Sequence, residues 1–254
     1  MFIDTHCHLT YEFGDDTESV IKHANDTGVG ALICATADPN DVRGAIQIAE
    51  THDNIFVTTG IHPEYTDANP FEILTDEILN HPLVIGVGEI GLDYHDGTQS
   101  KAQQIELFEK QLEIALKHNL PVAIHTRDAE QDTATILTDK HKGVMHCFTS
   151  SWDLARIMLD RGFYFSASGI LTFKNADSIR EIFTKIPTDR IVIETDSPYC
   201  APVPYRGKTC EPAFIIETAR VLAQIKNLSM GELEKILFEN TKRLYPKIEL
   251  YHNV

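Results

Sequence analysis

Several features that mark other classes of protein are missing from this chain of 254 residues. It has no Cys-x-x-Cys pair, and its five cysteines are an odd number, so we expect reduced thiols and not a disulfide framework. No apolar run approaches the roughly 20 residues that span a bilayer. Asp4, His6 and His8 fall where a secretory signal would be apolar. We therefore expect a cytoplasmic protein with no membrane partner.

Positive charge is also scarce. The chain has 22 Lys and Arg residues against 38 Asp and Glu residues, which gives a formal net charge of −16. Proteins that coat nucleic acid or bind membrane surfaces work through basic patches, so this balance argues against both. It leaves room for an enzyme that handles nucleic acid at one local site. With 43% hydrophobic and 24% charged residues, the composition is that of a soluble globular protein and excludes a disordered chain or a coiled-coil rod.

The sequence has neither a Gly-x-Ser-x-Gly elbow nor the glycine–lysine loop that cradles nucleotide phosphates. It does contain short apolar runs that alternate with amphipathic segments, which are typical of buried strands and of helices respectively. The predicted strands are residues 2–9, 31–36, 55–61, 84–92, 122–125, 144–148, 163–167 and 191–194. The predicted helices include residues 18–26, 41–51, 102–118, 152–161, 213–226 and 229–244.

Eight strands that alternate with helices can build an open doubly wound sheet or a closed barrel. The number of strands at this length favours a (β/α)8 barrel, the TIM barrel, and the absence of a linker or composition break favours one domain over residues 1–254. We predict helix N-caps at Asp38 or Asn40, at Ser100, and at Ser150 or Ser151. We predict glycine stops at Gly28, Gly143 and Gly162.

Active-site residues of such barrels lie at the carboxyl ends of the strands. The predicted strands end in His6 and His8, His62, Glu89, His125, His146 and Asp196, so five of the twelve histidines occur there. His6 and His8 are two residues apart and share a face of one strand, where two imidazoles suit a divalent metal. The alternative for either histidine is an ordinary hydrogen-bond network.

Carboxylates accompany these imidazoles. Glu89 follows a buried apolar strand, where an unpaired carboxylate costs several kcal/mol, and a bridging role between two metals would remove that cost. The alternative is a salt bridge to Arg127. Asp196 can hold a metal and accept a proton from a bound water, or it can simply cap the following Ser-Pro turn. His125 and His146 would bind a second metal.

Other residues are candidates for contact with an anionic substrate. His62 precedes Pro63 and can contact substrate, orient a ligand or serve structure alone. Arg127 shares a face with His125, and Arg206 and Lys208 lie in the loop after the last strand, where barrels often bind phosphate. For these basic side chains the alternative is simple solvation. We expect Cys7 and Cys147, each adjacent to a proposed ligand, to face away from the metals as packed thiols.

Six segments in this order resemble the TatD family of metal-dependent deoxyribonucleases. They are Asp-Thr-His-Cys-His-Leu at 4–9, Gly-Ile-His-Pro at 60–63, Gly-Glu-Ile-Gly-Leu-Asp-Tyr at 88–94, Ile-His-Thr-Arg at 124–127, His-Cys-Phe at 146–148 and Glu-Thr-Asp-Ser-Pro-Tyr at 194–199. The resemblance covers nearly the whole chain. It implies an amidohydrolase-like (β/α)8 barrel, two divalent metals, and 3′→5′ exonuclease activity on the 3′ end of single-stranded DNA.

The resemblance also implies a division of the ligands. His6, His8, Glu89 and Asp196 would hold one metal, and Glu89, His125 and His146 the other, with Glu89 and Asp196 as the catalytic carboxylates. His62, Arg127 and the loop with Arg206 would meet the substrate. The chain departs from the family at Cys210, which stands before Glu211-Pro212 where the family usually has Asn, so contacts of that loop are in doubt.

The metal could be Mg²⁺, Mn²⁺ or Zn²⁺: imidazoles favour transition ions, whereas the family is usually assayed with Mg²⁺. Two rival functions stay open. The same centre could hydrolyse an ester as a D-aminoacyl-tRNA deacylase, or the barrel could be a non-catalytic metal-binding scaffold. No heptad or exposed apolar stripe predicts a stable protein partner, so we expect a monomer.

Overall fold

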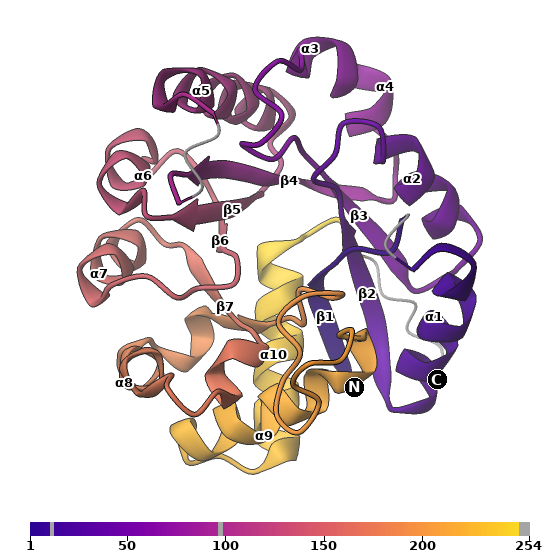
Figure 1. The fold of residues 1–254 in the computed structure, drawn as a ribbon, viewed down its shortest axis with the longest axis vertical. Helices are drawn as coiled ribbons and strands as arrows, with labels where there is room; N and C mark the ends of the chain where they lie inside the picture. The colour runs from indigo at the N-terminus through magenta and orange to yellow at the C-terminus, as the bar shows by residue number, and fades with distance from the viewer. Residues whose placement is uncertain (11–12, 96–98, 249–254) are drawn as a thin grey trace.

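The computed structural model describes residues 1–10, 13–95 and 99–248, and the tail of the predicted domain, residues 249–254, lies outside them. Its eight parallel strands pair in chain order within one sheet, and helices surround that sheet as a (β/α)8 barrel (Figure 1). The strands are β1 Phe2–Cys7, β2 Val29–Ala35, β3 Ile55–Thr59, β4 Val84–Asp93, β5 Val122–Arg127, β6 Gly143–Met145, β7 Tyr164–Ala167 and β8 Ile191–Ile193. The predicted barrel and its eight strands are therefore confirmed.

The barrel closes beside the predicted site. β8 ends at Ile193, and the segment after it continues the pairing with β1: the Asp196 amide donates to the His6 carbonyl at 2.9 Å, and the His8 amide donates to the Ser197 carbonyl at 2.8 Å. The backbone hydrogen bonds that close the barrel thus also fix Asp196 next to His6 and His8.

The helices have the bounds α1 Thr17–Asp26, α2 Val42–Glu50, α3 Pro70–Ile73, α4 Asp76–Leu79, α5 Lys101–His118, α6 Glu130–Ile136, α7 Trp152–Asp160, α8 Asp177–Lys185, α9 Ile215–Lys226 and α10 Met230–Leu244. Each predicted helix is present, with ends that differ by one or two residues. The helix ranges given as examples do not include α3, α4, α6 and α8. The first three have four to seven residues, too few for a clear apolar period. α8 has nine residues, as α2 and α7 do, so its amphipathic pattern could have been found from the sequence. In the part of the chain that the structure describes, no helix combines the length and apolarity needed to cross a membrane.

Two of the predicted N-caps are confirmed, because the hydroxyls of Ser100 and Ser151 accept bonds from the amides that begin α5 and α7. The N-cap of α2 is Asp41, so the prediction of Asp38 or Asn40 is wrong. The Asp38 carboxylate instead accepts a bond from the Asn40 amide at 2.8 Å and forms the preceding turn.

Two of the predicted glycine stops are also confirmed. Gly28 and Gly162 follow α1 and α7 at φ of 88° and 82°. Gly143 opens β6 and is not a helix stop; a Cβ there would come within 2.1 Å of the Val122 carbonyl oxygen.

The barrel interior is divided along its length. Residues near the strand starts, among them Ile3, Phe56 and Ile85, pack against Tyr245 and Ile248 in one apolar cluster. Tyr245 follows α10 and is fully buried, so the C-terminal segment closes the amino end of the barrel. The opposite, carboxyl end is left for the polar residues.

Candidate metal centre

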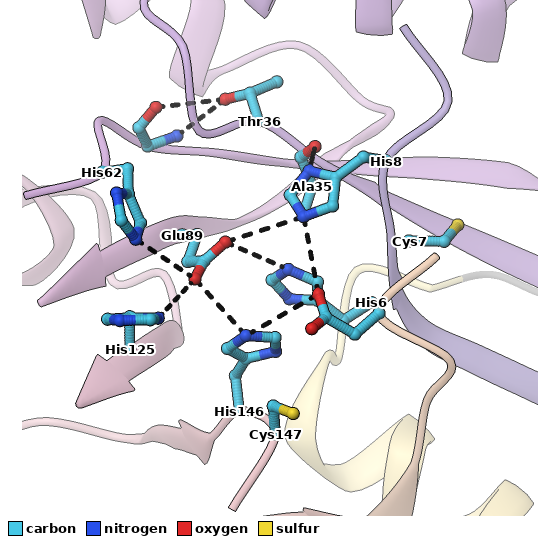
Figure 2. A network of polar contacts seen from close by, with 12 residues as sticks. His6, Cys7, His8, Ala35, Thr36, His62, Glu89, His125, His146 and Cys147 are labelled. Atoms are coloured by element: carbon cyan, nitrogen blue, oxygen red, sulfur yellow. Dashed lines mark hydrogen bonds and ion pairs between the residues drawn. The ribbon is translucent and has the colours of Figure 1, made fainter. Parts of the chain in front are cut away.

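Six polar side chains meet at the carboxyl end of the barrel. Three belong to strands, namely His6, Glu89 and His125, and the other three, His8, His146 and Asp196, follow the ends of β1, β6 and β8. Five imidazoles point toward Glu89, as Figure 2 shows. The centre opens into a cavity of about 560 Å³ whose lining includes His8, Glu89, His125, His146 and Asp196. His6 lies beneath them and is 1% exposed.

The two oxygens of Glu89 face different pairs of imidazoles. Oε2 lies 3.4 Å from His6 Nε2 and 3.7 Å from His8 Nε2. Oε1 lies 2.8 Å from His125 Nδ1 and 3.3 Å from His146 Nε2. Each oxygen could therefore face one cation, and the two pairs are those that the family resemblance assigns to different metals.

Asp196 lies between the two pairs. Its Oδ1 is 3.7 Å from His8 Nε2 and 4.0 Å from His146 Nε2. The φ of Asp196 is 58°, an unusual value for a residue with a side chain. The hydrogen bond from the Asp196 amide to the His6 carbonyl of β1 holds the backbone in this conformation. The side chain thus serves the centre and does not cap the following turn in the usual Asx manner.

Three of these imidazoles have their second ring nitrogen held from behind by an oxygen. Such contacts orient a ring so that its other nitrogen faces a metal, and they raise the basicity of that nitrogen. The contacts are His8 Nδ1 to the Ala35 carbonyl at 3.1 Å, His125 Nε2 to Asp93 Oδ2 at 2.9 Å, and His146 Nδ1 to Glu194 Oε1 at 2.9 Å.

The imidazoles of the centre keep its two carboxylates, Glu89 and Asp196, ionised. Burial alone would raise the pKa of Glu89, but the imidazoles around it, His146 foremost, hold that pKa well below its ordinary value. Burial likewise opposes ionisation of Asp196, yet the charge of His146 and the bond from His8 keep its pKa low. Both carboxylates are therefore ionised and available to cations at neutral pH.

The imidazoles differ from one another. Burial and the nearby His146 lower the pKa of His6, so it is neutral and has a free lone pair. Burial opposes protonation of His125, but the bonds to Asp93 and Glu89 raise its pKa to about 9. Glu194 and Glu89 likewise raise the pKa of His146 well above its ordinary value against the effect of burial. A metal at these nitrogens competes with protons, so its affinity rises with pH.

The donor set fits two divalent ions. His6, His8 and Glu89 each have a ligand atom within 4.8 Å of the other two. The same holds for Glu89, His125 and His146. Among the described residues, neither ring nitrogen of His6 has a hydrogen-bond partner although both are buried. Imidazole nitrogens mixed with carboxylate oxygens suit Zn²⁺ or Mn²⁺ and, through the oxygens, Mg²⁺.

Glycines let the backbone around Glu89 pack this closely. A Cβ on Gly60 would meet the Gly88 carbonyl carbon at 2.6 Å, and a Cβ on Gly88 would meet that of Ala123 at 2.6 Å. The run Gly86-Val87-Gly88-Glu89-Ile90-Gly91 also matches the glycine pattern of dinucleotide-binding turns. It lies wholly within β4 and makes no strand-to-helix turn, so it forms no such site.

The proposed substrate residues fall into two groups. His62 lines the cavity with its Nε2 3.8 Å from Glu89 Oε1, and Arg127 lines it with a half-exposed side chain. The ion pair of Arg127 is with Asp93, at 3.9 Å, and not with Glu89. Arg206 and Lys208 are exposed beside the rings of Phe173 and Tyr205, outside the residues that line the cavity.

The thiol prediction is half right. Cys7 is buried, and its Sγ donates to the Ile33 carbonyl at 3.5 Å, as a packed thiol should. Cys147 instead lines the cavity. Alternation of side chains fails there because β6 ends at Met145 and the φ of Cys147 is 41°.

Sequence reasoning missed two carboxylates that position ligands, Asp93 and Glu194. Glu194 could have been found, since it precedes Asp196 by two residues at a strand end and residues so spaced share a face. Asp93 is harder to find from the sequence. The register of β4 against β5 shifts between Val87 and Ile90, so the alternation of side chains does not show on which face of the strand Asp93 lies.

Known proteins share both the sequence and the fold. The family model described as TatD-related DNase matches residues 3–246. An uncharacterized metal-dependent hydrolase of Bacillus subtilis, YabD, is 38% identical over 252 residues that cover 96% of this chain and 99% of the relative. The Escherichia coli protein YcfH, described in the same words, is 36% identical over 96% of this chain and 95% of its own.

Solved structures agree. The TatD homologue YjjV of Escherichia coli superposes with a TM-score of 0.86 at 26% identity, covering 96% of this chain and 98% of that one. A TatD-family hydrolase from Entamoeba histolytica superposes with a TM-score of 0.84, also at 26% identity, covering 96% of this chain and 97% of that one.

Proposed function

Since the chain belongs to the family of TatD-related DNases, we propose that it is a metal-dependent hydrolase of phosphodiesters that acts as a 3′→5′ exonuclease on single-stranded DNA. The observation that carries the proposal is the division of Glu89 between two pairs of imidazoles. Relatives over the whole chain are described as metal-dependent hydrolases, which supports the reaction class.

The proposal assigns His6, His8, Glu89 and Asp196 to one divalent ion and Glu89, His125 and His146 to the other. When bound, two such ions offset the charge of a phosphate and bring the pKa of a water toward neutrality. The presence of every proposed ligand, and their convergence on one point, argue against a degenerate metal-binding scaffold.

The side chains of this chain supply the remaining parts of the reaction. Asp196 is ionised at neutral pH and takes the proton of the attacking water while that oxygen bonds to phosphorus and the sugar oxygen leaves. Arg127 and His62, both on the cavity lining, steady the scissile phosphate. Arg206 and Lys208 remain predictions for the nucleotides farther along the strand.

A direct comparison of substrates tests this function. A single-stranded DNA oligonucleotide with a 3′ label and a D-aminoacyl-tRNA are each incubated with the purified protein under Mg²⁺, Mn²⁺ and Zn²⁺. We expect release of labelled mononucleotide from this strand, and a ladder of shortened strands from the same oligonucleotide labelled at its 5′ end. Glu89→Gln, which keeps the shape of the side chain, is the control for a contaminating nuclease.

Two results would overturn the proposal. Release of the amino acid alone would assign the centre to the rival D-aminoacyl-tRNA deacylase. Inertness toward both substrates under all three metals would remove both esterase functions.

We propose further that residues 1–254 form one catalytic domain, which acts as a monomer in the cytoplasm. All five cysteines are free thiols, which supports a reducing compartment.

A further inference from the structure

Two thiols lie on the wall of the cavity and have no part in the proposed reaction. Cys147 follows His146 after β6, and Cys200 lies in the loop after β8. Both are partly exposed and line the cavity. Their sulfur atoms and one oxygen of Asp196 all lie within 4.8 Å of one another. We call these three residues the thiol trio.

The two oxygens of the Asp196 carboxylate face different neighbours, one the histidines and the other Cys200. Its Oδ1 faces the imidazole of His8 at 3.7 Å, whereas its Oδ2 accepts a hydrogen bond from Cys200 Sγ at 3.4 Å. Cys147 is fixed from its other side, because its amide donates to Glu194 Oε1 at 2.7 Å and its Sγ donates to Ser168 Oγ at 3.2 Å. The trio is therefore a held set of donors, two sulfurs and one oxygen.

We propose that Cys147, Cys200 and Asp196 form a third cation site, separate from the histidine pairs and selective for a thiophilic divalent ion such as Zn²⁺ or Cd²⁺. Soft sulfur donors prefer these ions to Mg²⁺ or Mn²⁺. With Zn–S bonds of about 2.3 Å, two sulfurs on one ion are at most about 4.6 Å apart, so small side-chain rotations bring the trio to bonding distance.

The binding step involves no oxidant. Each thiol gives its proton to the buffer and forms one sulfur–metal bond, and the already ionised carboxylate adds the third bond. The competing chemistry of a close thiol pair is a disulfide, which needs a thiolate to attack an oxidised partner. Without an oxidised partner the pair stays reduced, and both sulfurs remain available to a cation.

Occupation of the trio would inhibit the enzyme; this consequence rests on the proposed function. Asp196 serves both the catalytic centre and the trio, so an ion held by the two sulfurs draws its carboxylate away from the attacking water. Hard ions should therefore support turnover over a wide range of concentration, whereas Zn²⁺ or Cd²⁺ in excess should suppress it.

Cadmium is the probe for binding, because a cadmium–thiolate bond absorbs in the ultraviolet and a cadmium–imidazole bond does not interfere. The reduced, Mn²⁺-loaded protein is titrated with Cd²⁺. We expect thiolate absorption that saturates at one equivalent. Cys147→Ser and Cys200→Ser should each remove about half the amplitude and weaken binding about tenfold or more. Cys210→Ala, which removes a buried thiol outside the trio, should change neither.

Three binding results would overturn the site: no thiolate absorption in the wild type, equal absorption in the Cys147→Ser/Cys200→Ser double variant, or a disulfide between the two cysteines in the protein purified without reductant. Circular dichroism of each variant shows whether its fold is kept, and the wild-type titration decides even if a variant fails to fold.

A separate titration tests inhibition. Turnover of the Mn²⁺-loaded wild type should fall as Zn²⁺ passes one added equivalent, and Cys200→Ser should need about tenfold more Zn²⁺. Equal inhibition of both proteins would overturn the regulatory role. Absence of any turnover would instead sink the proposed function and leave the cadmium titration to judge the site.

Discussion

At the scale of single residues, the proposed division of the metal ligands depends on Glu89. A carboxylate that is 5% exposed at the end of a buried strand needs partners, and this much follows from the sequence. Which imidazole faces which oxygen does not, because it depends on side-chain rotamers on four different elements. The contacts of His146 with Glu194 and of His125 with Asp93 are tertiary for the same reason.

The first residue-scale prediction concerns Asp196. Asp196→Asn keeps the shape of the side chain and loses the proton acceptor, so turnover should fall about 100-fold or more. The measurement is the initial rate of hydrolysis of the oligonucleotide under saturating metal, with circular dichroism to verify the fold. A rate within a factor of two of the wild type would remove Asp196 from the mechanism.

The second concerns Glu194, which holds His146 from behind at 2.9 Å. Glu194→Gln retains the shape and weakens the hold on the ring, so affinity for Mn²⁺ should fall about 10- to 100-fold. Isothermal titration of the metal-stripped protein measures this directly. Glu181→Gln, on the exposed face of α8, is the matched control and should bind as the wild type does.

At the scale of elements, long strands and helices follow from periodicity, and their ends do not. β6 has three residues and stops before His146, so the predicted strand 144–148 and its alternation were too long. Because the predicted strand was too long, the side chain of Cys147 was expected to face away from the centre, whereas it lines the cavity. The unpredicted α3 and α4 have four residues each, too few for a helical period to show.

The element-scale prediction concerns the contact of α10 with the start of β8. Asn240 is fully buried, and its Nδ2 donates to the carbonyls of Thr188 and Ile191 at 2.8 and 2.7 Å. Asn240→Ala removes both of these buried hydrogen bonds and should lower the free energy of unfolding by about 2–4 kcal/mol in urea. Glu239→Ala, on the exposed side of the same helix, should change it by about 0.5 kcal/mol or less; equal losses in both variants would refute the role of the buried amide.

At the scale of the whole molecule, the net charge of −16 and a nucleic-acid substrate are compatible. Two divalent ions would return positive charge at one point, beside Arg127 on the cavity lining. On the proposed function, the excess of acidic side chains would repel the rest of a strand, and contact would be limited to a few phosphates at its end.

This predicts a shallow dependence of DNA affinity on salt. Each phosphate neutralised on a single strand contributes about −0.7 to the slope of log affinity against log salt. Two or three contacts give a slope of about −1 to −2. Fluorescence anisotropy of a single-stranded oligonucleotide with the Asp196→Asn protein under Mg²⁺ measures it, and a slope of about −5 or steeper would mean a long basic footprint instead.

The bridge made by Glu89 between two cation sites is the central claim, and metal content tests it most directly. Metal-stripped protein is reconstituted with Mn²⁺, which the thiol trio should not retain, freed of excess ion and analysed by inductively coupled plasma mass spectrometry. Wild-type protein should hold two Mn²⁺ per chain and folded Glu89→Ala protein fewer than one. Wild-type protein with no bound metal, or a Glu89→Ala protein that still holds two, would contradict the bridge.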